Sequence, residues 1–187
     1  MNTKQDIAHD SMIEKLPASD LIYDYDQINT ALDQLAETLN KQMAGTNPVI
    51  LCVMNGAIIF SGHLLTRFTF DCELDHIHAT RYQNTTDGDK LEWLSYPKTP
   101  LAGRTVLILD DILDEGITLD AIEKYCYSQG ADQVEKAVLL LKHHDRCCAE
   151  INSDHVALQV EDHYVFGFGM DYEGRFRHLN AIYSLRG

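Results

Sequence analysis

Residues 106–118 read VLILDDILDEGIT. The apolar run over residues 105–109 (TVLIL) is rich in branched side chains and predicts a short buried strand. The polar residues 110–116 then predict a turn, and residues 118–128 have the apolar spacing of a helix that Gly130 ends. This part of the chain is therefore expected to form a strand, a turn and a helix in succession.

The same succession occurs elsewhere in the chain. Residues 49–53 (VILCV) predict a fully buried strand, and residues 57–68 predict the helix that follows it. An earlier helix is expected to begin at Asp26 as its N-cap and to stop at Gly45. Further strands are predicted over residues 74–82, 91–96, 134–141, 156–160 and 165–168.

Alternating strands and helices favour an α/β fold, with a parallel sheet flanked by helices. In such sheets ligands bind beyond the carboxyl ends of the strands, so the residues just after each strand are the first candidates for chemistry.

Composition bounds the class of protein. The chain has 187 residues, which favours one domain over residues 1–187, with the polar residues 1–18 as a loose N-terminal arm. It carries 29 acidic against 15 basic residues, a net charge of −14, which argues against nucleic-acid binding and docking on an anionic membrane. The absence of an apolar N-terminal region and the five cysteines without a C-x-x-C motif favour a reduced, cytoplasmic protein.

One apolar stretch has the length of a membrane span. Residues 48–65 contain no Lys, Arg, Asp or Glu, and about 18 such residues suffice to cross a bilayer. Asn55, Gly56 and Ser61 interrupt the stretch, so a buried strand, a turn and a buried helix fit it better.

Four acidic residues crowd the predicted carboxyl end of the strand. Asp110, Asp111, Asp114 and Glu115 lie within six positions and repel one another unless something compensates them. Sugar hydroxyls and Mg²⁺ are natural compensators, and the amides of a helix that begins beyond Gly116 can bind a phosphate. The pattern predicts a site for a phosphorylated sugar. Its alternative is an acidic first turn that merely offsets the helix macrodipole.

Residues 106–118 resemble the phosphoribosyl-pyrophosphate (PRPP) motif of the type I phosphoribosyltransferases. From about Leu21 to the C-terminus the chain resembles the hypoxanthine-guanine branch of that family. The resemblance implies a parallel sheet flanked by helices, a small hood region and a mobile loop. It also implies a Mg²⁺-dependent transfer of the 5-phosphoribosyl group of PRPP to N9 of hypoxanthine or guanine, which yields IMP or GMP and pyrophosphate.

The resemblance also implies roles for the residues of the motif. Asp110 and Asp111 would hold the ribose hydroxyls, directly or through Mg²⁺, and Asp114 would be the general acid/base that faces purine N7. The 5′-phosphate would lie on Glu115, Gly116, Ile117 and Thr118. The family usually has Thr or Ser where this chain has Glu115, so Glu115 is expected to contribute only its backbone N–H.

Pyrophosphate would contact two further segments. Asn55 and Gly56 occupy the turn after the first buried strand, where the family often has Lys or Arg in place of Asn55; a simple strand–helix turn is the alternative. Arg177 matches the arginine that contacts pyrophosphate. Arg81 and Tyr82 begin the segment that resembles the mobile loop, and Arg81 is hypothesised to supply the charge that Asn55 lacks.

By the same resemblance Lys142, Tyr164 and Val165 would bind the purine, and Asp171 would meet a second Mg²⁺. An ammonium donates to the 6-oxygen of an oxopurine but meets the amino group of adenine unfavourably. From the residues alone, Lys142 also fits an ordinary surface lysine, and Tyr164 and Phe168 fit core aromatics. His143 and His144 are expected to lie in solvent rather than to bind metal.

The expected partners are PRPP and a 6-oxopurine, with no nucleic acid and no membrane, and the resemblance implies a homodimer or homotetramer. Two alternatives stay open: the same chemistry with xanthine or a pyrimidine preferred, and a PRPP-sensing regulator of the same fold.

Overall fold

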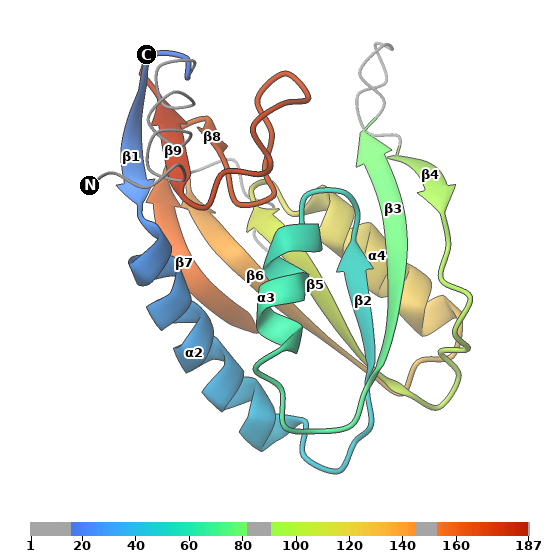
Figure 1. The fold of residues 1–187 in the computed structure, drawn as a ribbon. Coiled ribbons are helices and arrows are strands. Elements are labelled where there is room, and N and C mark those ends of the chain that lie inside the picture. The colour runs from blue at the N-terminus through green and yellow to red at the C-terminus, as the bar shows by residue number, and fades with distance from the viewer. Residues whose placement is uncertain (1–15, 82–90, 145–152, 187) are drawn as a thin grey trace.

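The computed structural model describes residues 16–81, 91–144 and 153–186 (Figure 1). In chain order the elements are β1 (Ser19–Tyr23), α2 (Tyr25–Gln42), β2 (Val49–Val53), α3 (Ile58–Leu65), β3 (Glu73–Arg81), β4 (Leu91–Ser95), β5 (Thr105–Leu113), α4 (Ile117–Ser128), β6 (Gln133–His143), β7 (His155–Glu161), β8 (Val165–Phe166) and β9 (Ile182–Leu185). None of the described helices is long and apolar enough to cross a membrane.

The larger of the two sheets has the strand order β4-β3-β2-β5-β6-β7. Its strands run parallel except for the edge strand β4, which pairs antiparallel with β3. Helices α2 and α3 cover one face and α4 covers the other (Figure 1). The predicted α/β fold, with a parallel sheet flanked by helices, is confirmed.

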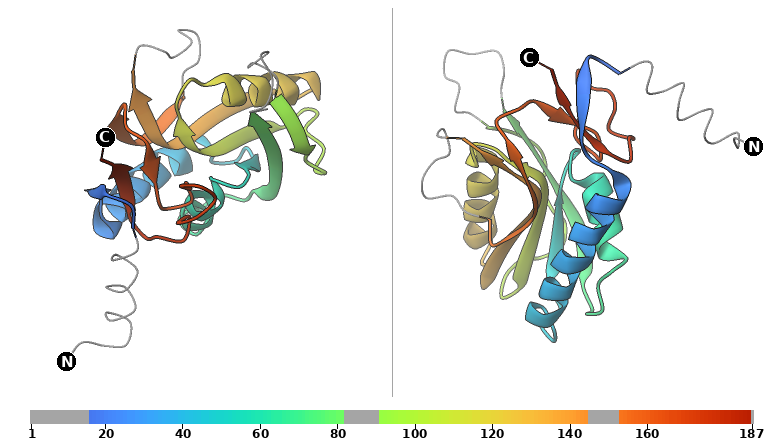
Figure 2. Two further views of the ribbon diagram at one scale, coloured as in Figure 1. Left: turned by 90° about the horizontal axis from the view of Figure 1, so that it is seen from above. Right: turned by 90° about the vertical axis from the view of Figure 1, so that its left-hand side faces the viewer.

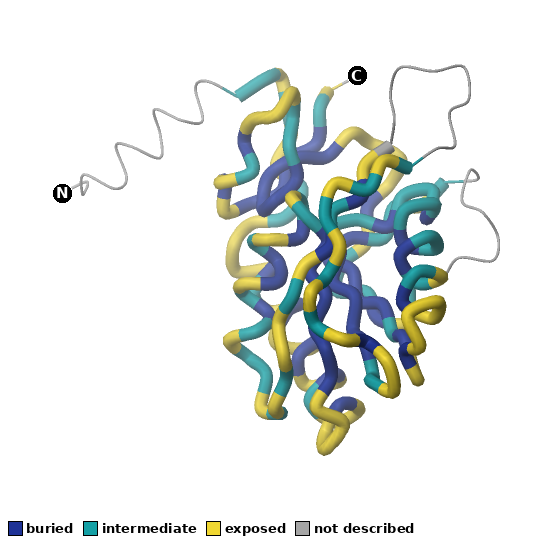
Figure 3. Tube along the Cα trace, turned by 90° about the vertical axis from the view of Figure 1, so that its right-hand side faces the viewer, coloured by how far each residue is buried: buried dark blue, intermediate teal, exposed yellow. Residues whose placement is uncertain are grey.

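Side-chain alternation along β5 explains why both faces are covered. Val106 and Ile108 pack into the core beneath α4, whereas Leu107 and Leu109 pack into the core beneath α2 and α3. All four side chains are fully buried, as expected for a central parallel strand whose successive residues face opposite sides. Figure 3 shows the buried residues concentrated in the strands at the centre of the molecule.

The second sheet is small and antiparallel, with the order β1-β9-β8. Its own apolar cluster includes Phe166, Phe176 and Tyr183, and Leu16 packs against it. Figures 1 and 2 place this sheet beyond the ends at which the parallel strands terminate, and it is the hood region that the resemblance implied. Neither β1 nor β9 was predicted, and residues 1–15 of the expected N-terminal arm lie outside the described residues.

The first helix begins earlier than predicted. Asp24, not Asp26, is the N-cap of α2: its Oδ1 accepts a hydrogen bond from the backbone N–H of Gln27 at 2.8 Å. The Gln27 side chain accepts in return from the backbone N–H of Asp24 at 3.0 Å, which completes a capping box. Asp26 lies in the first turn instead.

The prediction of a polar turn over residues 110–116 was wrong for residues 110–113, because β5 continues to Leu113. Asp110 pairs with Val138, and Leu113 pairs with Leu141, in the parallel ladder with β6. Acidic residues have low strand propensity, but the ladder offered by a neighbouring strand overrides that preference. As a result, two carboxylates stand on a rigid strand rather than on a loop.

Other boundaries differ by a few residues. Helix α3 ends at Leu65 rather than at residue 68, and β6 extends to His143 rather than stopping at residue 141. Strand β8 covers only Val165–Phe166, because Gly167, Phe168 and Gly169 all have positive φ angles.

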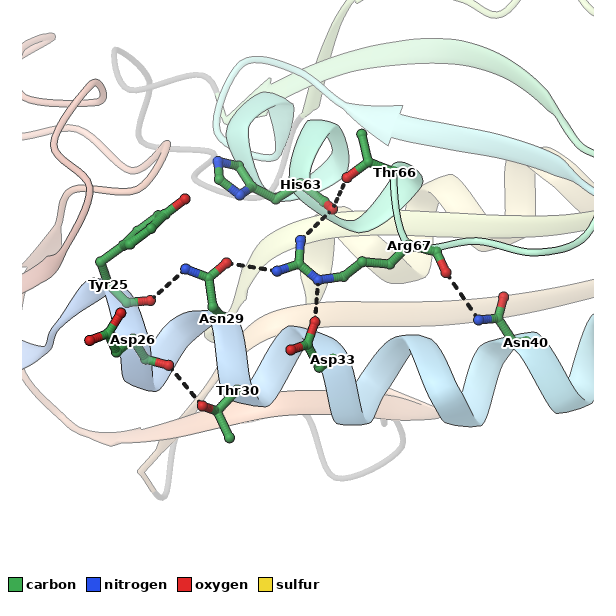
Figure 4. A network of polar contacts seen from close by, with 9 residues as sticks. All are labelled: Tyr25, Asp26, Asn29, Thr30, Asp33, Asn40, His63, Thr66 and Arg67. Atoms are coloured by element: carbon green, nitrogen blue, oxygen red, sulfur yellow. Dashed lines mark hydrogen bonds and ion pairs between the residues drawn. The ribbon is translucent and has the colours of Figure 1, made fainter.

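A hydrogen-bonded arginine fixes α2 to the end of α3 (Figure 4). The Arg67 guanidinium donates to Asp33 Oδ1 at 2.6 Å, to Asn29 Oδ1 at 2.7 Å and to the backbone carbonyl of His63 at 2.8 Å. Its own carbonyl accepts from the Asn40 side chain at 3.0 Å. These contacts hold the C-terminal end of α3 against α2.

Candidate active site

A cavity of about 520 Å³ opens at the carboxyl ends of β2, β3 and β5. Its walls come from the turn after β2, the end of β3, the end of β5 and the start of α4, together with Asp171 and Arg177 from the segment after β8. This is where the parallel-sheet rule places a ligand site.

Two adjacent carboxylates form the floor of this cavity. Asp110 is 7% exposed, and its Oδ1 accepts a hydrogen bond from the backbone N–H of Asp111 at 2.9 Å. Burial, followed by the charge of Asp111, raises the pKa of Asp110 well above its usual range, and burial also raises the pKa of Asp111. The protein groups around the two carboxylates therefore do not fully compensate two negative charges at this position.

The turn after β2 approaches these carboxylates without a side chain between them. A Cβ added to Gly56 would lie 1.8 Å from Asp111 Oδ2, and a Cβ on Gly169 would lie 2.1 Å from the Gly56 carbonyl oxygen. The peptide bond between Met54 and Asn55 is cis, and both residues line the cavity. Only glycines allow the turn, the acidic strand and the post-β8 segment to meet so closely.

The start of α4 presents backbone amides to the cavity. Gly116 is the N-cap, with φ 81°, and has no side chain of its own to cap the first amides of the helix. Glu115, Gly116 and Thr118 line the cavity, whereas the Ile117 side chain does not. A helix N-terminus of this kind can bind an anion through its amides and its dipole.

Asp114, just beyond β5, is held by two cationic or hydrogen-bonding side chains of the neighbouring strand. The pairing of Leu113 with Leu141 places Asp114 beside Lys142, whose Nζ lies 2.7 Å from Asp114 Oδ2. The Nε2 atom of His144 lies 2.6 Å from Asp114 Oδ1. Burial raises the pKa of the Asp114 carboxyl, but the hydrogen bonds and charges of Lys142 and then His144 outweigh it, so the net pKa is lowered.

The prediction that His144 lies in solvent is wrong. Its side chain is only 3% exposed, whereas His143 is exposed and contacts Gln159 Oε1 at 2.7 Å. Alternation explains the difference, since residues 142 and 144 face the same side of an extended chain and residue 143 faces the other. Had the strand been predicted to continue past residue 141, this alternation would have indicated His144.

Arg177 and Asp171 form an ion pair in the wall of the cavity. The Arg177 Nη2 atom lies 2.5 Å from Asp171 Oδ1, and Nη1 donates to the Gly169 carbonyl at 2.7 Å. The second carboxylate oxygen of Asp171 accepts from the Gly174 backbone N–H at 2.7 Å. The charge of Arg177 also acts to lower the pKa of Asp111, so the guanidinium faces the acidic floor.

The predicted purine residues lie beside this cavity rather than in its wall. Tyr164 is 52% exposed, so it is not a core aromatic, and its hydroxyl donates to the Asp171 carbonyl at 3.1 Å. Val165 is buried in the ladder of β8 with β9, and Phe168 is fully buried as a core residue. Lys142 forms an ion pair with Asp114, and Asp114 in turn lines the cavity.

The expected mobile loop begins where the described part of the chain ends. Arg81 is the last residue of β3, and Tyr82 with the rest of the expected mobile loop, residues 82–90, lies outside the described residues. The hypothesis that Arg81 replaces a basic residue at position 55 stays a prediction.

Among the described residues, no three His, Cys, Asp or Glu side chains are grouped so that they could hold a metal ion by themselves. The donor set of the cavity nevertheless suits Mg²⁺, because this ion is commonly bound by one or two carboxylates together with substrate phosphates. Asp110, Asp111 and Asp171 supply such carboxylates around a single cavity.

The phosphoribosyl transferase domain family matches residues 20–174, most of the chain. The chain belongs to the phosphoribosyltransferase family. It is 30% identical to a hypoxanthine-guanine phosphoribosyltransferase of Streptococcus thermophilus, over 94% of this chain and 97% of that protein. A hypoxanthine-guanine-xanthine phosphoribosyltransferase of Tritrichomonas foetus is 28% identical over 89% of this chain and 91% of its own length.

The fold of the family is shared as well. A crystal structure of a hypoxanthine phosphoribosyltransferase from Staphylococcus aureus superposes with a TM-score of 0.86, at 23% identity, over 98% of this chain and 97% of that one.

Proposed function

We propose that the chain transfers the 5-phosphoribosyl group of PRPP to N9 of hypoxanthine or guanine and releases pyrophosphate. The observation that carries this proposal is the joint placement, at one sheet edge, of a buried acidic pair, a helix N-terminus without a side-chain cap and the Asp114–Lys142 ion pair. The names of the Streptococcus and Tritrichomonas relatives support the choice of base.

PRPP would bind along the cavity from α4 towards the turn after β2. The amides at the start of α4 and the Thr118 hydroxyl would hold the 5′-phosphate, and Asp110 and Asp111 would accept hydrogen bonds from the ribose hydroxyls. Pyrophosphate would lie between the backbone of Gly56 and the Arg177 guanidinium, whose planar fork suits paired phosphate oxygens.

The base would stack on the exposed ring of Tyr164, with its 6-oxygen towards Lys142 and its N7 towards Asp114. An ammonium placed there donates to a carbonyl oxygen but repels the amino group of adenine. The site is therefore expected to select 6-oxopurines.

In the reaction, the bond between C1′ and the pyrophosphate oxygen breaks, and its electron pair leaves with pyrophosphate. The lone pair of N9 forms the new bond to C1′, and the proton on N7 passes to the Asp114 carboxylate. Asp110 and Asp111 stabilise the positive charge that develops on the sugar, and Arg177 neutralises the leaving group. Mg²⁺, when bound by these carboxylates and the substrate oxygens, would supply charge neutralisation of the same pyrophosphate.

Cellular location and assembly are part of the same proposal. Cys52, Cys72 and Cys126 are free thiols, which fits the reducing cytoplasm. We expect a homodimer or homotetramer. Light scattering on the protein as it elutes from a size-exclusion column measures the mass and shows which of the two is formed.

An initial-rate assay with PRPP, Mg²⁺ and a panel of bases tests the proposal. Hypoxanthine or guanine should be turned over, adenine and uracil poorly, and a metal chelator should abolish the reaction. Preferred turnover of xanthine would change the base but retain the chemistry. Turnover of adenine at the rate of hypoxanthine would refute the role of Lys142, and PRPP binding without turnover of any base would indicate a regulator instead.

A further inference from the structure

The contact between His144 and Asp114 has no role yet in the proposed reaction. His144 follows β6 directly, and its Nε2 atom approaches Asp114 Oδ1 to 2.6 Å, while Lys142 approaches Oδ2 to 2.7 Å. The two oxygens of the proposed acid/base are thus each held by a different side chain of the same strand end.

Purine binding would affect the Lys142–Asp114 contact but not the His144–Asp114 contact. If the base binds as proposed, the Lys142 ammonium must turn part of its donor capacity to the 6-oxygen, so its hold on Asp114 changes at each turnover. His144 has no proposed contact with the substrate. Its side chain is 3% exposed against 40% for Asp114, so the protein encloses the ring far more completely than the carboxylate.

A carboxylate held at one oxygen only can rotate about its side-chain bonds away from N7. The bond to His144 leaves Oδ2 as the oxygen that faces Lys142 and the base, before and after the proton arrives. A catalytic group must be held within a fraction of an ångström of its productive position, and neighbouring side chains provide this hold. A misplacement of about 1 Å can lower the rate by a factor of about 100.

We propose that His144 is a positioning residue that holds Asp114 through Oδ1 and thereby keeps Oδ2 directed at the purine proton. The proposal rests on the proposed function, since it gives His144 its role through Asp114.

Two substitutions of His144 separate a hydrogen-bonding role from a packing role. His144→Gln keeps an N–H donor near the place of Nε2, whereas His144→Leu fills the buried site without a donor. His143→Leu is the matched control, because His143 is the exposed neighbour whose ring contacts Gln159. Thermal unfolding of every variant is followed by circular dichroism before kinetics are compared.

With hypoxanthine and PRPP, His144→Leu should lower kcat by at least about tenfold, which corresponds to the loss of a hydrogen bond to a charged group. Its KM for PRPP should stay within about twofold of the wild-type value, because the α4 amides and Arg177 are untouched. His144→Gln should recover most of the lost kcat, and His143→Leu should match the wild type.

The pH profile of kcat provides a readout that packing alone would not move. The acid limb of His144→Leu should shift to higher pH, because one donor that favours the ionised form of Asp114 is gone. The limb of His144→Gln should shift less.

Each outcome decides the proposal. A folded His144→Leu variant with wild-type kcat overturns it, as does a His144→Gln variant that loses as much kcat as His144→Leu. Should His144→Leu not fold, the pH profile of His144→Gln decides: kcat near that of the wild type with an acid limb shifted to higher pH supports the role, and an unshifted limb or a tenfold loss of kcat overturns it. A wild-type chain inactive on every base overturns the proposed function first, and the role of His144 with it.

Discussion

The backbone of Gly56 lies directly against the carboxylate of Asp111. A Cβ on residue 56 would stand 1.8 Å from Asp111 Oδ2 and 2.5 Å from its Cγ, so either the turn or the carboxylate would have to move. The Asp111 backbone belongs to a strand paired with β6, so only its side chain or the turn after β2 can move to make room. The contact therefore couples the turn after β2 to the acidic floor of the cavity.

We expect Gly56→Ala to raise the KM for PRPP by at least about tenfold, because the new methyl group displaces either the turn or a sugar-binding carboxylate. Initial rates at varied PRPP concentration measure this. Gly62→Ala is the control: it lies inside α3 with nothing within 4 Å of the added Cβ. That variant should keep wild-type kinetics and gain about 0.5–1 kcal/mol in unfolding free energy. Equal KM values for the two variants would contradict the coupling.

Replacing Asp110 should stabilise the folded protein and weaken its function. Burial and the Asp111 charge raise the pKa of Asp110, so ionising this group costs folding free energy as pH rises from its unfolded pKa towards the raised folded one. At neutral pH Asp110→Asn should therefore increase the unfolding free energy by about 0.5–2 kcal/mol while it weakens PRPP binding. Urea unfolding at neutral pH and at pH about 3 checks the sign, because the gain should shrink in acid. A variant destabilised at neutral pH would show that the charge is already compensated.

Asp114→Asn should lower kcat by at least about tenfold, because an amide cannot take the N7 proton. Lys142 and His144 outweigh burial and lower the pKa of Asp114. The wild-type Asp114 carboxylate therefore stays ionised to a lower pH than an ordinary aspartate, and its own protonation should lower kcat only at a correspondingly lower pH. A pH profile of kcat for the wild type and the variant checks both statements. Wild-type turnover by Asp114→Asn would remove Asp114 from the reaction.

The apolar runs in the sequence were sufficient to predict most of the parallel sheet. Val106 to Leu109 are buried on both faces, and a run of this kind has few alternatives to a central strand. Residues 110–113 were misassigned because local propensity disfavours acidic strands, whereas the ladder with β6 is a tertiary feature. Strands β1 and β9 were missed for a related reason: Ser19 pairs with Leu185, and nothing local in either short segment predicts a partner so distant in the chain.

The candidate site was predictable as a set of residues but not as a set of contacts. Asp114 and Lys142 were each singled out, yet their ion pair depends on the register that pairs Leu113 with Leu141. His144 was dismissed because an adjacent pair of histidines normally lies in solvent, and only the extra length of β6 turns one of them inward. The approach of Gly56 to Asp111 likewise depends on how two strands are placed, which no single-sequence pattern encodes.

Arg67 should contribute to stability without affecting the reaction. Its guanidinium is largely buried and donates to Asn29, Asp33 and the His63 carbonyl, so Arg67→Met leaves these acceptors without their partner. We expect the free energy of unfolding in urea to fall by about 1–3 kcal/mol, the range for hydrogen bonds to a charged group. The matched control is Lys41→Met, which removes a solvent-exposed pair with Glu37 and should cost no more than about 0.5 kcal/mol. Both variants should keep the wild-type KM for PRPP at 25 °C or below, since Arg67 lies at the far end of α3 from the cavity. A loss for Arg67→Met no larger than that for Lys41→Met would mean that the network in Figure 4 does not hold α2 to α3.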